Sequence, residues 1–305
     1  MCSTKIIIST VLLLALTWGA HSVSLTGEPG EPGEPQAPKD DKVGFGLQYQ
    51  NTGVRFFSTP EIYSSAWGEH LNRALVRYTE LIGAPSPVDV TLVATQAEAA
   101  NVALPRSANR SLTLSLDQIQ SKTATLGSEY AVIAHELCHS WFIGTLESNG
   151  LKQTKDVMGM PVYGHIAAPD WLDEAVAIHC ESGDVAASRL TGDFKRALIE
   201  DFIVQEHPVF AAMKEKIMAV MKQKKAGQTT TITMKSGDHD YVSFYKQSAW
   251  FKRFLLATRG NDIFKDLVGH LADGDSLDQV ILSNTADGSW PAVNRQFNQF
   301  IDNNQ

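Results

Sequence analysis

Two histidines and a glutamate lie within one short stretch of the chain, residues 131–142, which reads AVIAHELCHSWF. His135 and His139 are four positions apart, so on an α-helix both imidazoles project from one face and can hold a single metal ion. Glu136 lies beside them, close enough to hold a water molecule on that metal. Residues of these types at this spacing can form the core of a metal-dependent hydrolase.

The residues around this H-E-x-x-H pattern are almost all apolar and leave the predicted helix with hardly any polar face. A helix that is apolar nearly all round is a buried one. Two histidines and a glutamate inside it must be paired or bound to a metal, because an unpaired buried charge is costly. The alternative is a surface helix with two solvated histidines, which this composition disfavours.

A catalytic zinc site needs a third protein ligand and an open position for water. Residues 169–179 read PDWLDEAVAIH and predict a second helix, on which Glu174 stands among small residues. Asp173 is better suited to accept a hydrogen bond from a ligand, or to be an acid in the first turn of that helix. The rivals of Glu174 as third ligand are His165, Asp170, Asp173 and His179.

The two segments together resemble the gluzincin zinc metallopeptidases, in particular the M1-like, or peptidase MA-like, catalytic domain. In that family a helix of the form HELxHxWF precedes a WLxEGxA helix whose glutamate completes the site, and this chain has HELCHSWF and WLDEAVA. The resemblance implies one Zn²⁺ per chain, bound by His135, His139 and Glu174, with Glu136 as general base. The interval between His139 and Glu174 is longer than in the family, which implies an insertion within residues 147–169.

A tyrosine at the start of a later helix also has a role in this family, because its hydroxyl reaches the oxyanion of the tetrahedral intermediate. Residues 245–255 read YKQSAWFKRFL, and the resemblance assigns this catalytic role to Tyr245. The alternative is a core aromatic packed with Tyr241 and Phe244. Tyr241 and His239 are the substitutes for the role.

The family's aminopeptidases anchor the free amine of a substrate with a GAMEN-type strand, and residues 101–116, NVALPRSANRSLTLSL, contain no glutamate for this purpose. The sequence therefore slightly favours an endopeptidase over an aminopeptidase. A non-hydrolytic zinc-containing binding or assembly protein of the same fold is the alternative from another functional class.

Periodicity predicts the elements that position these residues. Residues 43–50 and 54–57 form a hairpin, and a helix runs from Thr59 to about residue 82. Alternating apolar residues predict strands at 88–92 and 112–116. The second strand lies directly ahead of the predicted helix that carries His135 and His139, here called the metal helix. The predicted helices from residue 127 onward are 127–143, 171–182, 186–204, 209–224, 240–258, 261–272, 276–284 and 290–302.

This order of elements predicts an α+β fold, with a small N-terminal mixed sheet and helix followed by a mostly helical C-terminal lobe. The resemblance implies a thermolysin-like (gluzincin) catalytic domain over residues 43–305. Its α+β lobe covers about 43–145 and its helical lobe about 170–305.

The chain has 305 residues, of which 43% are hydrophobic and 20% charged, an ordinary composition for a globular protein. Its net charge of −8 and its lack of a basic cluster argue against a nucleic-acid partner. We expect a peptide or protein substrate instead.

The N-terminus has the composition of an export signal. Lys5 precedes the apolar run 6–16, and small or polar residues follow, which predicts a signal peptide over residues 1–22 with cleavage after Ser22. The run is too short to span a bilayer comfortably, so we expect a secreted or periplasmic protein without a stable membrane anchor. Residues 23–42 contain three Gly-Glu-Pro triplets and predict an extended linker.

Removal of the signal leaves two cysteines, Cys138 and Cys180. In an exported protein they could form a disulfide. Two small buried thiols are an equally good interpretation of the sequence.

Overall fold

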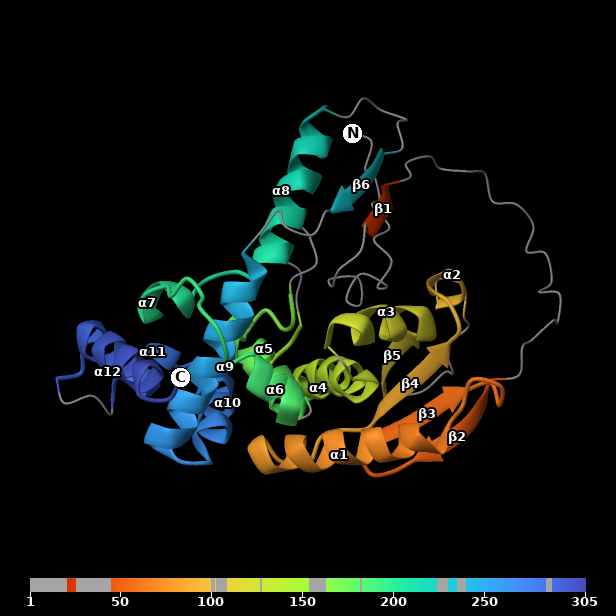
Figure 1. Ribbon diagram of the computed structural model, residues 1–305, viewed down its shortest axis with the longest axis horizontal. Helices are drawn as coiled ribbons and strands as arrows, with labels where there is room; N and C mark the ends of the chain where they lie inside the picture. Colours follow the sequence, from red (N-terminus) through yellow and green to blue (C-terminus); the bar gives the residue numbers. More distant parts are fainter. Residues whose placement is uncertain are drawn as a thin grey trace.

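A computed structural model describes residues 21–25, 45–99, 102, 109–126, 128–153, 163–181, 183–223, 230–234, 240–283 and 287–305. Within these ranges the chain is mixed α/β, with mostly helical content and one four-stranded sheet (Figure 1). This arrangement is compatible with the predicted α+β class.

The four-stranded sheet has the strand order β2-β3-β4-β5. The predicted hairpin is confirmed: β2 (Gly46–Gln50) and β3 (Val54–Ser58) pair antiparallel. β4 (Val88–Val93) and β5 (Arg110–Ser115) add parallel strands, so β5 forms one edge. Every residue of β4 is buried, including Asp89 and Thr91, because both faces of this parallel strand are covered.

The helix α1 (Ser65–Leu81) connects β3 to β4 and begins later than predicted. Thr59 was the predicted cap, but the helix starts after Ser64, which has an extended backbone and whose hydroxyl oxygen accepts the Ala66 N–H. Ser64 therefore satisfies a free N–H group of the first turn. A short helix, α2 (Gln96–Ala99), lies between β4 and β5.

A helix that the sequence analysis missed, α3 (Leu116–Leu126), lies between β5 and the metal helix. Leu116 continues the apolar alternation of the strand but is already the first helical residue. The predicted strand is present as β5, but its predicted position directly ahead of the metal helix was wrong, because α3 lies between them.

The metal helix itself is α4 (Glu129–Ser148), and the predicted WLDEAVA helix is α5 (Asp170–Cys180). In Figure 1, α4 lies in the middle of the molecule, where it packs against α1, α3, α5 and β5. α9 (Tyr241–Arg259) packs against the other side of α5. The two helices that carry the predicted ligands are thus the central pair of the fold.

Two tryptophans of the sequence motifs tie this central pair to its surroundings. Trp141 of α4 donates its indole N–H to the carbonyl oxygen of Gly53 in the hairpin loop, over 2.8 Å. Trp171 of α5 packs edge-on against Phe251 of α9, with ring centroids 5.0 Å apart. Both tryptophans are fully buried in one continuous apolar core that reaches from the sheet to the C-terminal helices.

The single helix predicted over residues 186–204 is instead two short helices, α6 (Gly183–Ser188) and α7 (Ile199–Phe202). Gly192 lies between them with φ +69°, a left-handed conformation that a continuous helix does not contain. The remaining predicted helices are present as α8 (Pro208–Gln223), α10 (Ile263–Asp273), α11 (Leu277–Leu282) and α12 (Trp290–Asp302).

A second, two-stranded sheet was not predicted: β1 (His21–Leu25) pairs antiparallel with β6 (Thr230–Met234). The predicted cleavage position after Ser22 falls within β1. The rest of the predicted signal peptide and linker lies outside the described residues. Among the helices that are described, none combines the length and the apolar character needed to cross a membrane.

Candidate metal centre

The two histidines of α4 and the glutamate of α5 meet at the contact between these helices. The Nε2 atoms of His135 and His139 are 3.0 Å apart, and they lie 3.7 and 3.6 Å from the two carboxylate oxygens of Glu174. All three residues are buried, and their ligand atoms lie within 4.8 Å of one another. The predicted ligand set is therefore a group that could bind a metal ion.

The chemistry of this donor set fits a transition metal such as zinc. Glu174 is fully buried, and its Oε2 atom has no hydrogen-bond partner among the described residues. A buried carboxylate oxygen without such a partner is unfavourable unless a cation compensates its charge. Two imidazoles and one carboxylate are a common zinc donor set.

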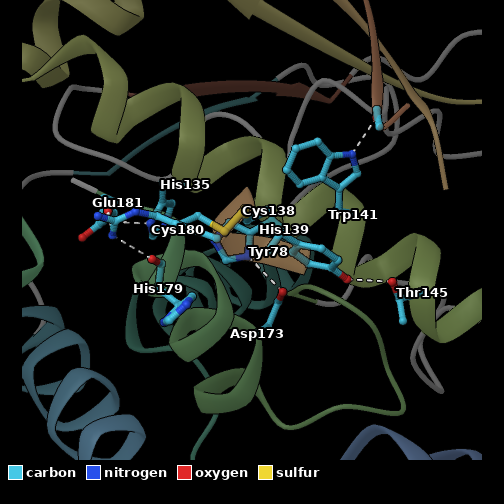
Figure 2. The surroundings of a disulfide bond; sticks show 12 residues. Tyr78, His135, Cys138, His139, Trp141, Thr145, Asp173, His179, Cys180 and Glu181 are labelled. Atoms are coloured by element: carbon cyan, nitrogen blue, oxygen red, sulfur yellow. Dashed lines mark hydrogen bonds and ion pairs between the residues drawn. A yellow bond between two sulfur atoms is a disulfide. The ribbon is translucent and has the colours of Figure 1, made fainter. Parts of the chain in front are cut away.

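The rival ligands occupy other positions. Within the described part of the chain, the group that could bind a metal ion contains none of His165, Asp170, Asp173 and His179. Asp173 lies behind the site, with its Oδ1 atom 3.0 Å from Nδ1 of His139 (Figure 2). This is the position expected of an acceptor that orients a ligand.

His135 has a corresponding acceptor that the sequence analysis missed, Glu181. Its Oε1 atom is 3.0 Å from Nδ1 of His135, and Arg189 donates to both oxygens of the same carboxylate. Burial raises the pKa of Glu181, but Arg189 and His135 outweigh burial and lower that pKa to about 2. Glu181 follows Glu174 by two helical turns, a spacing that could have identified it.

The environment of His139 is more negative. Burial lowers the pKa of this histidine, but Asp173 and Glu174 outweigh burial and raise it to about 9. Without a metal the site therefore favours a proton on His139. A bound cation would replace that proton and satisfy the same carboxylates.

The predicted general base, Glu136, forms an ion pair with Lys122 of α3, with 2.5 Å between Nζ and Oε1. Burial raises the pKa of Glu136, but Lys122 and the two histidines together lower it. The carboxylate is therefore ionised and able to accept a proton. Lys122 belongs to the helix that the sequence did not predict, so no sequence signal pointed to this pair.

Tyr245 lies beside the site on α9. Its ring centroid is 6.3 Å from that of His135, and its hydroxyl is 3.3 Å from Nε2 of His207. Burial, followed by the charge of Glu174, raises the pKa of Tyr245 well above its ordinary value, so the phenol stays protonated and can donate a hydrogen bond. Of its substitutes, Tyr241 packs edge-on against Tyr245, and His239 lies outside the described residues.

A further tyrosine, Tyr163, reaches the ligands themselves. Its hydroxyl donates to Oε1 of Glu174 and lies 3.3 Å from Nε2 of His139. Its ring stacks on that of His207, with centroids 4.3 Å apart and planes at 16°. Tyr163 belongs to the predicted insertion, where the family pattern offers no guide.

Cys138 and Cys180 form a disulfide, which resolves the alternative that the sequence left open. Cys138 lies between the two histidines on α4, and Cys180 directly precedes Glu181 at the end of α5. Figure 2 shows this link between the two helices. The Cα atoms of Cys138 and Cys180 are 6.5 Å apart. The disulfide therefore fixes the contact at which the ligands meet.

A scan against protein-family models found no match for this chain, and no curated protein matches its sequence. The assignment of the site therefore depends on its residues and their geometry.

Proposed function

We propose that this chain is a zinc metallopeptidase of the gluzincin type, with a thermolysin-like organisation around α4 and α5. The observation that carries the proposal is the meeting of His135, His139 and Glu174 at one buried point, with Glu136 adjacent on α4. A purely structural zinc site has no use for a base beside the metal.

His135, His139 and Glu174 would hold the ion. Zinc, when bound, lowers the pKa of a water molecule toward about 7 and polarises the substrate carbonyl. Glu136 accepts the proton of the attacking water and delivers it to the leaving amine. Lys122 contacts Oε1 of Glu136 and keeps the carboxylate ionised, so Oε2 is the oxygen suited to proton transfer.

The neutral phenol of Tyr245 would stabilise the negative charge that develops on the carbonyl oxygen. A peptide could pair with β5, because this strand forms an edge of the sheet and leads directly into α3. Main-chain pairing at an edge accepts many side chains, which suits an endopeptidase slightly better than an aminopeptidase.

Export through a signal peptide at residues 1–22 is part of the proposal. The disulfide between Cys138 and Cys180 supports it, because disulfides persist in oxidising compartments outside the cytosol. We propose a secreted or periplasmic enzyme that acts on peptides or proteins.

The test is a mixed peptide library incubated with the purified protein, with and without a chelator, and scored for cleavage positions. We expect chelator-sensitive cuts, and Glu136→Gln should reduce their rate by about 10²–10⁴-fold with its zinc content unchanged. Glu174→Ala should instead lose the zinc. Glu129→Gln, at the start of the same helix, is the matched control and should retain both zinc and activity.

Internal cuts would identify an endopeptidase, and terminal trimming would identify an aminopeptidase. Full activity of Glu136→Gln would contradict the mechanism. A wild-type protein that binds one zinc but cuts no peptide would favour the binding or assembly protein instead.

A further inference from the structure

Tyr163 contacts two of the three candidate metal ligands. Its hydroxyl contacts two atoms at once, Oε1 of Glu174 and Nε2 of His139. Both atoms belong to the group that could bind the metal. A group within reach of two ligand atoms on neighbouring helices lies close to the position between them.

The ring of Tyr163 is held by packing against three other rings. It stacks on His207, and it stands edge-on to His139 with centroids 5.8 Å apart and planes at 84°. Phe210 of α8 lies 6.2 Å from it on a further side. A stacked ring between buried neighbours has few rotamers available, so its hydroxyl is directed at the ligands.

The backbone next to Tyr163 is also fixed. Gly164 has φ +54°, and a Cβ atom at this position would lie 2.0 Å from Oδ2 of Asp173. Only glycine lets the chain pass this close to the carboxylate that supports His139. The side chain of Gln153 donates to the carbonyl oxygen of Gly164 and accepts from the N–H of Ile166, over 2.9 and 3.1 Å.

The second tyrosine of the site makes a different contact. The hydroxyl of Tyr245 is 3.3 Å from Nε2 of His207, and that nitrogen is itself 3.7 Å from Oε1 of Glu174. Tyr245 thus reaches the ligand set through a histidine, whereas Tyr163 touches it directly. The two phenols therefore make a matched pair for experiment.

We propose that Tyr163 is a fourth protein ligand of the metal, so that the resting centre is formed by two histidines, a glutamate and a tyrosine. Its phenol oxygen binds on the side shared by Glu174 and His139, and its proton is released to solvent when the metal enters. This inference requires metal binding at the site but not peptide hydrolysis.

The consequence for the proposed enzyme is that the tyrosine must leave the metal before water and substrate can use the same position. The resting site would then be closed by the chain itself. Tyr163→Phe would open that position while it keeps the ring and its packing against His207.

The test uses the full-length protein freed of metal and loaded with one equivalent of Cu²⁺, because phenolate bound to Cu²⁺ gives a charge-transfer absorption band in the visible range. We expect this band in the wild-type protein and in Tyr245→Phe, and its loss in Tyr163→Phe at equal copper content. Resonance Raman spectra of wild-type protein with ring-deuterated tyrosine should show shifted phenolate bands, a measurement that needs no variant. With zinc, Tyr163→Phe should lower the affinity by about tenfold or more.

A copper-loaded wild-type protein without the band would overturn the inference, and so would a band that persists in Tyr163→Phe. Either result leaves the proposed hydrolysis standing if chelator-sensitive cuts are observed. A wild-type protein that binds neither copper nor zinc at one equivalent would overturn both proposals.

Discussion

His135 and His139 project from the same face of α4, but different kinds of group support them. Behind His135 is Glu181, whose carboxylate is paired on both oxygens by Arg189. Behind His139 is Asp173, which has no lysine or arginine partner among the described residues. His135 is therefore supported by a carboxylate whose charge is neutralised by an arginine, and His139 by a carboxylate whose charge is not neutralised in this way.

This difference separates two tasks. The His135 side is built into the fold, because Arg77 also donates to the carbonyl oxygen of Glu181 over 2.6 Å and Cys180 is disulfide-bonded next to it. The His139 side affects the candidate ligand directly, because Asp173 and, to a smaller extent, Glu174 raise the pKa of His139 to about 9. We therefore expect changes behind His135 to affect stability most, and changes behind His139 to affect metal binding most.

The largest effect should come from the disulfide, which belongs to the His135 side. Its cysteines are 42 residues apart. A closed loop of this size lowers the conformational entropy of the unfolded state, which stabilises the folded state by ~4 kcal/mol. We expect Cys138→Ala/Cys180→Ala to lower the free energy of unfolding by up to this amount in metal-free protein. Denaturant unfolding measures this loss, and a separate zinc titration of the folded protein against a chromophoric chelator measures any change in metal affinity.

Wild-type protein that is unfolded, reduced and refolded in reductant is the control for this double variant, since it retains both sulfurs. It should lose the same stability. If neither form loses stability, the His135 side does not depend on the disulfide, and the proposed division between the two histidines fails.

Glu181→Gln should have the next largest effect. It leaves Arg189 largely buried beside an uncharged partner, and loss of one partner of a buried pair destabilises by about 3 kcal/mol or more. Glu181→Gln/Arg189→Met should recover part of this loss, because no unpaired charge remains. Thermal or denaturant unfolding of the three proteins measures the difference.

The same variant makes a pH prediction. The pKa of Glu181 falls from its ordinary 4.5 to about 2 on folding, so its contribution is complete above pH 4.5 and is lost as the pH falls toward 2. The stability gap between wild-type protein and Glu181→Gln should be constant near neutral pH and close through this acid range. A stability gap that does not change with pH would show that the ionised carboxylate of Glu181 is not the source of the gap.

The parts of the site that could be predicted are those that belong to a motif within a single helix, one motif on α4 and one on α5. The spacing of His135 and His139 fixes their common face, and Glu174 was found through a second motif of the same kind. Lys122 and Tyr163 come from segments that only the tertiary packing brings to the site, so local periodicity contained no information about them.

The fold shows the same limit. Strand alternation and the apolar faces of α4 and α5 were predictable because they recur every few residues. The predicted helix boundaries were wrong where a single side chain or backbone conformation determines where a helix begins or is interrupted. Ser64 caps α1 in place of Thr59, and Gly192 separates two helices where one was predicted.

The smallest effect on stability, and the sharpest test of the comparison, should come from Asp173→Asn. Asparagine keeps an oxygen that can accept from Nδ1 of His139, so we expect the free energy of unfolding to change by less than about 1 kcal/mol. The loss of the charge makes His139 a weaker ligand, and changes behind a ligand typically lower metal affinity by about 10–100-fold. Competitive zinc titration at several pH values measures this deficit.

The deficit should depend on pH in a definite direction. Below about pH 9 a proton competes with zinc for His139 in the wild-type protein, and Asp173 is the main reason for that proton's affinity. Removal of Asp173 weakens the binding of a proton to His139 as well as the binding of zinc. At pH 6, weaker competition from the proton cancels part of the loss of zinc affinity. At pH 9 it cancels none of this loss. The affinity gap between wild-type protein and Asp173→Asn should therefore widen as the pH rises, whereas Asp184→Asn, an exposed change on α6, should show no gap. A gap that narrows toward pH 9 would mean that Asp173 does not set the charge state of His139, and the two histidines would then be supported alike.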